Sequence, residues 1–466
     1  MSNAFDTYEK ITEIDAPAEA VYQWHTRPGA VARLVPPWSG IRLIEAPATL
    51  VEGALTTLSV ALGPSRSKWI LEYRNVDPGR SFQTAQRSGP FAHWIHTHRF
   101  EPAGDRCRLI DRVEYALPAT TVGRAASQWV PGRLERTFRY RHDVTREDVT
   151  AHRRYATSPR LTVAITGASG LIGRTMSSYL EAAGHRVRPV VRSTPRNNQI
   201  GWHPDSGAID QASFEGLDAV IHLAGENVAA RRWTTRQMAR IRESRTTGTR
   251  LLAETLAGLE RPPRILVSAS AIGYYGDRGS EEIDEDTGPG EGFLADVAEE
   301  WERSTDPAAD GGIRTVLTRF GVVLSPSGGA LAKMLPPFRA GLGGRLGSGR
   351  QWMSWISLDD VLGGLESVLF DENLSGPVNL VGPAPVTNAD FAKVLAGVLC
   401  RPALLPVPSV VLHATLGLMA DDLLLASTRV VPRRLRESGY VFRHSNLETA
   451  LRHVLGRAGA SERPGV

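Results

Sequence analysis

Apolar and polar residues alternate through most of the chain up to residue 117, and helical spacing then closes this region. Residues 4–15 alternate as a strand does, and residues 17–38 follow helical spacing with a break at Arg27-Pro28. Turn-forming residues separate further strand-like runs, which are 56–62, 68–76, 82–87, 92–100 and 106–117. A long helical stretch covers about residues 122–154. These elements predict an antiparallel sheet with a long closing helix.

The pattern changes after residues 156–160, which contain Thr157-Ser158-Pro159 and are predicted to be a linker. Buried strand patterns at 185–191, 218–223, 264–268 and 315–324 follow, with helical stretches at 234–256 and 294–305 between them. This alternation is typical of a doubly wound parallel sheet with right-handed connections. We therefore expect a domain at 1–155, the linker at 156–160, a nucleotide-binding domain at 161–400 and a small, largely helical domain at 401–466.

The stretch 161–173 predicts a nucleotide site at the start of the parallel sheet. A short apolar strand runs into Gly167, Gly170 and Gly173, and helical spacing begins at Leu171. Gly167 allows a tight turn, Gly170 lets the backbone approach a pyrophosphate, and Gly173 lets the helix pack closely on the strand. The start of the helix then faces the phosphates.

The second predicted strand of the parallel sheet ends in Arg192-Ser193. An NAD-binding fold has an acidic residue at this position, which binds the ribose 2′-hydroxyl, whereas a cation there binds a 2′-phosphate. We therefore expect NADP(H) rather than NAD(H), with help from Arg196. The alternative is that Arg192 is only a solvated residue at a strand end.

Charge and cysteine content narrow the classes of function. The formal net charge is +4 and the basic residues are scattered among acidic ones, so we expect no nucleic-acid partner. Cys107 and Cys400 are the only cysteines and form no metal or disulfide pattern. The N-terminus has no secretory signal pattern, and the apolar stretch 403–418 contains Pro406 and Pro408 and is too short to span a bilayer. We expect a cytoplasmic protein without membrane insertion.

Trp94, His96, His98 and Phe100 fall on one face of a predicted strand, because side chains alternate with period two. A His-x-His pair is a candidate for metal binding, but the spacing indicates no third ligand. Cross-strand pairing with Asp111 or Glu114, which lie on opposite strand faces, explains the histidines more simply. We therefore expect no metal site. A polar feature of a ligand cavity remains an alternative.

Four motifs resemble the extended short-chain dehydrogenase/reductase superfamily: Thr-Gly-Ala-Ser-Gly-Leu-Ile-Gly at 166–173, Leu-Ala-Gly at 223–225, Ser-Ala-Ser-Ala-Ile-Gly-Tyr-Tyr-Gly at 268–276 and Trp-Ile-Ser-Leu-Asp-Asp-Val at 355–361. Further segments at 225–227, 244–249, 329–338 and 347–355 are similar to its atypical epimerase family branch, and 402–455 resembles the small C-terminal domain of that branch. The resemblance implies a Rossmann fold and an NADP(H) site, and leaves the substrate open.

The first region also resembles a known fold, the START-like (SRPBCC) helix-grip fold. The similarity rests on Ile14-Asp15-Ala16-Pro17 and on the closing helix. It implies an apolar cavity for a lipid-like or aromatic ligand.

Active members of the superfamily use a Ser on the fifth strand and a Tyr-x-x-x-Lys pair on the next helix. Counting from Ser270, the positions of the pair hold Phe293 and Val297, and no lysine lies between residues 69 and 332. Tyr274 and Tyr275 follow Ser270 closely, so we name these three residues as catalytic candidates. The alternative is that both tyrosines only pack beneath the cofactor.

The resemblance and the strand ends together assign the cofactor to a larger set of residues. These are Thr166, Gly167, Ala168, Ser169, Gly170, Leu171, Ile172, Gly173, Arg192, Ser193, Leu223, Ala224, Gly225, Glu226, Arg245 and Ser268. Arg245 replaces an Asn of the superfamily, and we expect it to bind a phosphate or a backbone carbonyl. The glycine-rich segment 341–355 predicts a mobile loop over the substrate, and the alternative is that its glycines only form turns and its tryptophans pack in an interdomain core. Asp359 and Asp360 are predicted helix N-caps rather than catalytic residues.

These observations predict an NADP(H)-dependent oxidoreductase or epimerase that acts on a small, hydrophobic substrate with help from the first domain. A non-catalytic sensor of NADP(H) is the alternative, because the Tyr-Lys pair is missing. The composition leaves a homo-oligomer open.

Overall fold

The computed structural model describes residues 5–63, 65–120 and 127–457 and divides into two compact units. The N-terminal unit comprises the described residues up to Arg160, Ser178–His185 and the end of the chain from Leu455. The second unit comprises Leu161–Ser177 and Arg186–Val454. Within the described residues, no helix combines the length and the apolar character that crossing a membrane requires.

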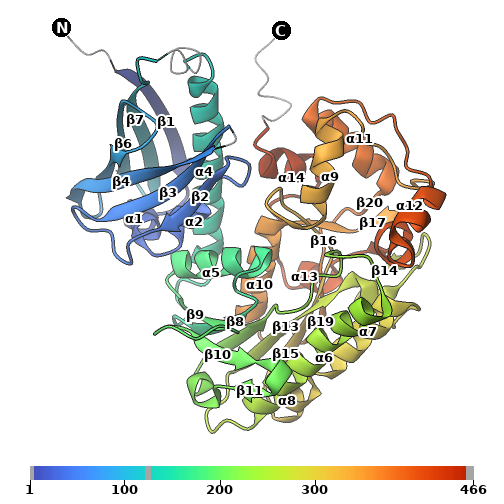
Figure 1. The fold of residues 1–466 in the computed structure, drawn as a ribbon. Coiled ribbons are helices and arrows are strands. Elements are labelled where there is room, and N and C mark those ends of the chain that lie inside the picture. The colour runs from blue at the N-terminus through green and yellow to red at the C-terminus, as the bar shows by residue number, and fades with distance from the viewer. Residues whose placement is uncertain (1–4, 64, 121–126, 458–466) are drawn as a thin grey trace. The chain divides into compact units, whose positions relative to one another are not determined.

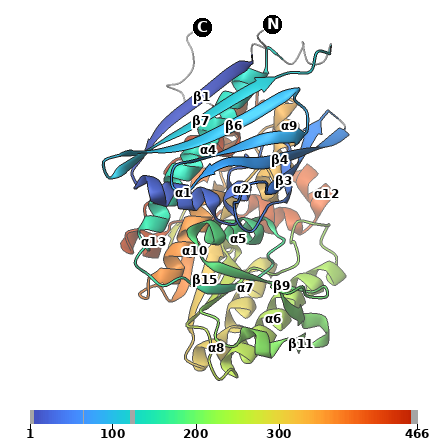
Figure 2. The ribbon, with the colours of Figure 1, turned by 90° about the vertical axis from the view of Figure 1, so that its left-hand side faces the viewer.

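The N-terminal unit is built on a seven-stranded antiparallel sheet in the order β1-β7-β6-β5-β4-β3-β2 (Figures 1 and 2). Its strands are β1 (Asp6–Ile14), β2 (Ile41–Glu45), β3 (Leu55–Leu62), β4 (Ser65–Asp77), β5 (Ser81–Ser88), β6 (His93–Ala103) and β7 (Arg106–Ala116). All six predicted strands are present, and β2 is an additional one. The predicted antiparallel sheet is confirmed.

Among the described residues, helices α1, α2 and α4 accompany this sheet. The predicted break at Arg27-Pro28 separates α1 (Ala18–Thr26) from α2 (Ala30–Arg33). The closing helix is α4 (Val130–Arg153), while residues 122–126 of the predicted helix lie outside the described residues. Leu134 and Phe138 of α4 pack against the sheet, so the helix-grip arrangement is confirmed.

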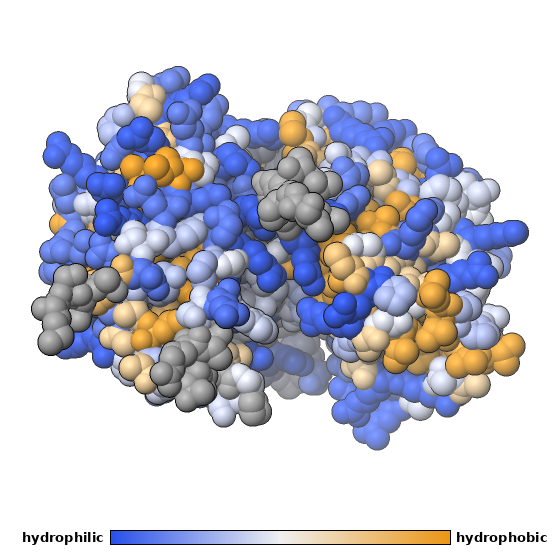
Figure 3. Space-filling view, turned by 90° about the horizontal axis from the view of Figure 1, so that it is seen from above, coloured by the Kyte–Doolittle hydropathy of each residue, from blue (hydrophilic) through white to orange (hydrophobic). Residues whose placement is uncertain are grey.

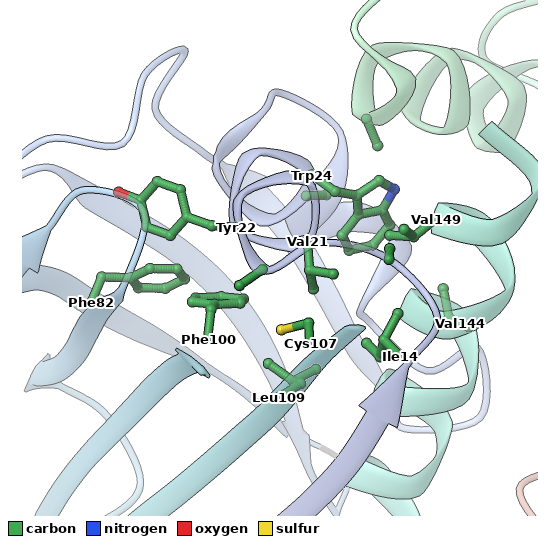
Figure 4. Close-up of a cluster of buried hydrophobic side chains, with 14 of the residues drawn as sticks. Ile14, Val21, Tyr22, Trp24, Phe82, Phe100, Cys107, Leu109, Val144 and Val149 are labelled. Atoms are coloured by element: carbon green, nitrogen blue, oxygen red, sulfur yellow. The ribbon is translucent and has the colours of Figure 1, made fainter. Parts of the chain in front are cut away.

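The core of the N-terminal unit lies between the sheet and these helices. Figure 4 shows Val21, Tyr22 and Trp24 of α1 facing Phe100 and other side chains of the sheet and α4. Each buried side chain of this size contributes about 1.5–3 kcal/mol to stability. Large aromatic side chains therefore fill much of the space between α1 and the sheet.

The second unit contains an eight-stranded sheet in the order β11-β10-β9-β8-β12-β13-β15-β19. Neighbouring strands pair in parallel except β11 with β10. The six strands from β10 to β15 follow the order 3-2-1-4-5-6 of a Rossmann fold. The predicted doubly wound sheet is confirmed, and we call this part the Rossmann unit.

The strands of this sheet are β8 (Thr162–Thr166), β9 (Arg186–Val191), β10 (Ile200–His203), β11 (Ala208–Ile209), β12 (Ala219–His222), β13 (Ile265–Ala271), β15 (Arg314–Phe320) and β19 (Gly376–Leu380). Helices that follow them are α5 (Leu171–Ala183), α6 (Thr235–Ala257), α7 (Phe293–Arg303), α8 (Asp306–Asp310), α9 (Gly329–Arg339) and α10 (Leu358–Phe370). Leu252 and Leu256 of α6 join the buried cluster that contains Val220 and Leu266 of the sheet. The apolar face of α6 thus covers one side of the sheet.

The predicted strand 315–324 is two strands. β15 ends at Phe320, and β16 (Val322–Leu324) pairs with β18 (Trp355–Ser357) in a separate small sheet. A Cβ on Gly321 would lie 2.6 Å from the Ser354 carbonyl oxygen, so only glycine allows the two segments to approach this closely. The apolar run alone did not reveal this change of sheet.

The prediction that Asp359 and Asp360 are N-caps is wrong, because Ser357 caps α10. The Ser357 Oγ accepts a hydrogen bond from the Asp360 amide at 2.9 Å and donates one to the Asp360 carboxylate at 2.7 Å. Both aspartates lie in the first turn, where their charge favours the helix N-terminus.

The last part of the chain contains α11 (Asn388–Leu399), α12 (Ser409–Leu416), a single π-helical turn (Asp421–Leu425), α13 (Arg433–Glu437) and α14 (Leu447–Val454). Short strands β14 (Glu282–Ile283) and β21 (Arg429–Val430) pair, as do β17 (Trp352–Met353) and β20 (Val386–Thr387). Leu404, Val410 and Leu418 are exposed. Figure 3 shows hydrophobic side chains gathered in patches between hydrophilic ones on one face of the molecule.

Candidate functional site

The glycine turn between β8 and α5 has the geometry that a bound phosphate requires. Gly167 has φ +65°, and a Cβ there would lie 2.7 Å from the Leu223 carbonyl oxygen. A Cβ on Gly173 would lie 2.3 Å from the Gly167 carbonyl oxygen. Gly170 is exposed, and a Cβ there would approach only this same oxygen, at 3.1 Å. The turn is therefore closed on the protein side and open at Gly170 and Ser169, next to the start of α5.

Thr166 supports this turn from inside the protein. Its buried hydroxyl accepts hydrogen bonds from the amides of Leu223 and Ala224 and lies 2.7 Å from His222 Nδ1. The hydroxyl therefore donates its own proton to Nδ1, so His222 carries its proton on Nε2, which lies 2.9 Å from Thr249 Oγ1. Burial lowers the pKa of His222 to about 4, so the ring is neutral at pH 7. The chain of hydrogen bonds fixes β8 and β12 at the ends that adjoin the turn.

Arg192 and Ser193 follow β9 and are exposed. Within the described residues, the Arg192 guanidinium has no hydrogen bond and no ion pair, so it is available to an anion beyond the strand end. The predicted position for a 2′-phosphate ligand is thus occupied by an unengaged cation.

A cavity of about 420 Å³ lies in the Rossmann unit. Ala271 and Phe320 contribute to it at the carboxyl ends of β13 and β15, which is where doubly wound sheets bind ligands. Val228 follows β12, Val297 and Trp301 come from α7, and 421–426 close another side. Leu346, Trp352 and Met353 of the predicted loop segment also line the cavity. Its wall is largely apolar.

Arg245 on α6 is a half-buried, positively charged residue of the cavity wall. Its Nη1 donates to the carbonyl oxygens of Glu226 and Ile241, both at 3.0 Å, and its guanidinium lies 4.9 Å from the centre of the Trp301 ring. Burial lowers the pKa of Arg245 to about 10, so the group stays charged at pH 7. Within the described residues, Nε and Nη2 have no hydrogen-bond partner. The expected carbonyl contact is present, and two donors remain free for a ligand.

Glu226 lies beside this arginine at the end of β12. Its amide donates to Ser244 Oγ at 3.0 Å, and its carboxylate accepts from Gln237 Nε2 at 3.2 Å. Arg240 lies 3.6 Å from the same carboxylate. Glu226 thus connects the segment after β12 to α6, and Gly225 leaves room for the Arg245 guanidinium, 3.4 Å from where its Cβ would be.

The catalytic candidates Ser270 and Tyr275 belong to a buried polar network rather than to the cavity wall. Ser270 Oγ donates to Glu302 Oε1 at 2.6 Å, and Glu302 forms two hydrogen bonds of 2.8 Å with Arg319. Arg319 donates to the Tyr275 hydroxyl at 2.9 Å, which in turn donates to Asn379 at 2.8 Å. Burial raises the pKa of Tyr275 to about 12, so its phenol is not acidic near neutral pH.

Tyr274 stacks on the same arginine. The Arg319 guanidinium lies 3.6 Å from the centre of the Tyr274 ring. The two positions where a Tyr-Lys pair would stand carry no acid or base: Val297 is buried in the cavity wall, and Phe293 packs on Trp233 with ring centres 5.0 Å apart. Ser270, Tyr274 and Tyr275 are not among the described residues that line the cavity.

The structure also brings in residues that the sequence did not single out. Glu302 accepts the hydrogen bond of Ser270 and is itself paired with Arg319. The Trp301 ring packs against the Arg245 guanidinium. A carboxylate on an otherwise apolar helix face, next to Trp301, is the signal that could have identified Glu302. Arg319 offers a similar signal, because it interrupts an apolar strand.

Comparisons with known proteins agree with this architecture. A model of the NAD dependent epimerase/dehydratase family matches residues 163–379, and a domain of unknown function (DUF1731) matches residues 407–454. A model described as polyketide cyclase / dehydrase and lipid transport matches residues 14–142. An epimerase family protein of Mycobacterium bovis is 45% identical over 298 residues, which cover 64% of this chain and 98% of that protein.

The chain belongs to the epimerase family. Its N-terminal unit is a polyketide cyclase/lipid transport (SRPBCC) domain, as the helix-grip resemblance predicted. Human epimerase family protein SDR39U1 is 36% identical to this epimerase family chain over 299 residues, which cover 63% of the chain and 99% of the human protein.

Two solved structures are similar to this epimerase family protein. The nucleoside-diphosphate sugar epimerase from Corynebacterium glutamicum has a TM-score of 0.80 and 33% identity, and the match covers 96% of this chain and 90% of that one. Human SDR39U1 (isoform 2), crystallised with NADPH, has a TM-score of 0.59 and 35% identity, and the match covers 63% of this chain and 99% of that one.

Proposed function

We propose that the Rossmann unit is an NADP(H)-dependent oxidoreductase that interconverts a carbonyl group and an alcohol on an apolar small molecule. The observation that carries this proposal is the 420 Å³ apolar cavity at the ends of β13 and β15 with the Arg245 guanidinium in its wall. The wall is largely apolar, and Arg245 is the one basic residue among the described lining residues, which favours a hydrophobic substrate that carries an oxygen function. The sequence placed Arg245 with the cofactor, whereas its position in the cavity leads us to assign it to the substrate.

The residues present fit NADP(H). The turn at Gly167 and Gly173 leaves no room for side chains, and Gly170 opens toward the space where a pyrophosphate would meet the start of α5. Arg192 is the free cation expected to bind the 2′-phosphate. The human relative crystallised with NADPH supports the same cofactor.

When bound, NADPH supplies a hydride for a carbonyl carbon in the cavity. Arg245 Nε and Nη2 bind the substrate oxygen and stabilise the negative charge that develops on it, a contribution of about 2.7–4 kcal/mol for such a donor. The apolar part of the wall lowers the local dielectric constant around the guanidinium, which strengthens this interaction. Water supplies the proton that completes the alcohol, because the hydroxyls of Ser270 and Tyr275 are engaged with Glu302 and Asn379.

Hydride tracing tests this proposal. The full chain is incubated with NADPH deuterated at C4 and a panel of medium-chain and aromatic aldehydes and ketones, and the products are analysed by mass spectrometry. We expect one deuterium on the former carbonyl carbon of at least one compound. NADPH binding without deuterium transfer to any compound of the panel would contradict an oxidoreductase of this type.

Exchanging the charge of Arg192 should change the preference between the two cofactors. We expect Arg192→Asp to weaken NADPH binding about 10–100-fold, because one charge-assisted hydrogen bond contributes about 1.5–3 kcal/mol. NADH affinity should stay the same or rise. Titration calorimetry with both cofactors measures the ratio, and Arg186→Asp, at the other end of β9, is a matched control. An unchanged ratio in Arg192→Asp would remove this residue from the site.

A specific observation favours a second candidate function, a non-catalytic sensor of NADP(H). Phe293 and Val297 replace the acid/base pair, and Ser270 and Tyr275 donate their protons within a buried network. In that case NADPH would bind and change the state of the chain without any hydride transfer. The deuterium experiment separates the two functions.

We also propose that the N-terminal unit binds an apolar ligand, in line with the family description polyketide cyclase / dehydrase and lipid transport. Native mass spectrometry of the freshly purified full chain tests this directly. A co-purified apolar molecule would support the proposal and also nominate a compound for the hydride assay.

A further inference from the structure

Three histidines surround one aspartate in the interior of the N-terminal unit. In the pairing of β6 with β7, His98 lies opposite Asp111, and His96 lies two residues away on the same strand face. His142 comes from α4, which packs on this face. The exposed fractions of His96, His98 and Asp111 are only 3%, 7% and 2%. The sequence showed His-x-His without a third ligand, whereas the fold adds Asp111 and His142.

Two ring nitrogens crowd one oxygen of Asp111. His96 Nε2 lies 3.0 Å from Oδ1 in hydrogen-bond geometry, and His98 Nδ1 lies 2.7 Å from the same oxygen. The direction of the second contact is not that of a hydrogen bond, and His98 Nδ1 has no hydrogen-bond partner among the described residues. A buried nitrogen without a partner is costly unless another ligand satisfies it.

The other Asp111 oxygen is held from the helix side. His142 Nε2 donates to Oδ2 at 2.8 Å, and His142 Nδ1 lies 2.8 Å from Thr12 Oγ1 on β1. This arrangement fixes the plane of the carboxylate and leaves Oδ1 directed at His96 and His98.

The charges of this cluster call for a cation. The Asp111 side chain is buried, and the rings of His96, His98 and His142 contact its carboxylate oxygens. Within the described residues, no Lys or Arg nitrogen lies within 4.0 Å of Asp111. The nearby Arg141 donates instead to the Leu34 carbonyl oxygen and stacks on Phe138. A buried carboxylate without a cation in contact is unfavourable.

We propose that His96 Nε2, His98 Nδ1 and the Asp111 carboxylate bind one divalent transition-metal ion, with His142 orienting the carboxylate. The three ligand atoms lie within 4.8 Å of one another. Metal bonds of about 2.1 Å at right angles place neighbouring ligand atoms about 3 Å apart, which is close to the contacts of His96 and His98 with Oδ1. Two imidazoles and one carboxylate suit zinc, iron or manganese and leave coordination positions open.

Cobalt titration of the full chain tests this site. The chain is stripped with a chelator, Co²⁺ is added, and visible absorption and elemental analysis report the bound ion. We expect one Co²⁺ per chain, displaced by Zn²⁺, and no binding in His98→Ala or Asp111→Asn. His142→Asn, which removes only the orienting contact, should weaken binding about 10–100-fold.

His93→Ala is the matched control and should bind cobalt like the wild type. His93 begins the same strand, but its ring stacks on Phe5 with ring centres 3.9 Å apart. Circular dichroism checks that each variant is folded. A wild-type chain that binds no cobalt would overturn the proposal whatever the variants do. Unchanged binding in folded His98→Ala would place the ion elsewhere and overturn it as well.

Discussion

Arg319→Met is expected to destabilise the Rossmann unit by about 3–5 kcal/mol, because it leaves the carboxylate of Glu302 buried without its cation. In the wild type, Arg319 forms both hydrogen bonds to this carboxylate and also donates to the Tyr275 hydroxyl. The side chains of the pair are only 4% and 9% exposed, so water cannot replace the lost partner. Methionine keeps much of the volume of the side chain and removes the charge.

Hydrogen exchange followed by mass spectrometry measures this effect within the full chain. Amides of β13 and α7 should exchange about 10²-fold faster or more, because each 1.4 kcal/mol corresponds to a factor of ten. Amides of β6 and β7 in the N-terminal unit serve as an internal reference. Arg303→Met is the matched control: Arg303 pairs with Glu299 on the exposed side of α7, at 2.9 Å and 61% exposure, and such pairs contribute at most about 1 kcal/mol. Equal effects of the two substitutions would show that the buried network does not stabilise the sheet.

Arg245→Met is expected to lower kcat about 10²–10³-fold on any substrate that the deuterium experiment identifies. The guanidinium is the charged donor group in the cavity wall, and its free Nε and Nη2 are placed to bind the substrate oxygen as negative charge develops there. NADPH affinity should change little, because this prediction gives Arg245 no contact with the cofactor. Arg245→Lys should recover only part of the rate, since a compact ammonium cannot make the same paired contacts.

Steady-state kinetics and NADPH titration of the same variants measure both quantities. Arg242→Met is the control on the same helix, because Arg242 pairs with Glu300 at 2.6 Å and does not line the cavity. If Arg245→Met lost NADPH affinity and kept its kcat, Arg245 would be a cofactor-binding residue, as the sequence pattern predicted.

Much of the fold could be predicted because it depends on local patterns of apolar, polar and glycine residues. The alternation along β6 placed His96 and His98 on one buried face, and the turn at Gly167 and Gly173 marked the start of the parallel sheet. Where two strands join different sheets within one apolar run, as at Gly321, the pattern fails. The reason is physical: the close approach to Ser354 is a contact between distant segments, and local residue preferences do not record it.

The candidate sites were less predictable for the same reason. Ser270 was found from its motif, but its partner Glu302 lies 32 residues away and its role depends on how α7 packs against β13. Asp111 was one of two candidates for the histidines, and the register of β6 with β7 decides between them. His142 contributes from α4, and no spacing along the chain connects it with the His-x-His pair.

Two parts of the cavity wall differ in how far their sequence can change without disturbing the fold. Ala271 and Phe320 belong to the ends of the central sheet, where any change of length disturbs strand pairing with β13 or β15. Residues 421–426 form one irregular turn, and this turn pairs with no strand of this sheet among the described residues. All six of these consecutive residues line the cavity. Under the proposed function, exchange of this short segment alone would change which molecules fit the cavity and would leave the ends of β13 and β15 unchanged. Replacing this turn is therefore the simplest way to redesign which molecules the cavity accepts.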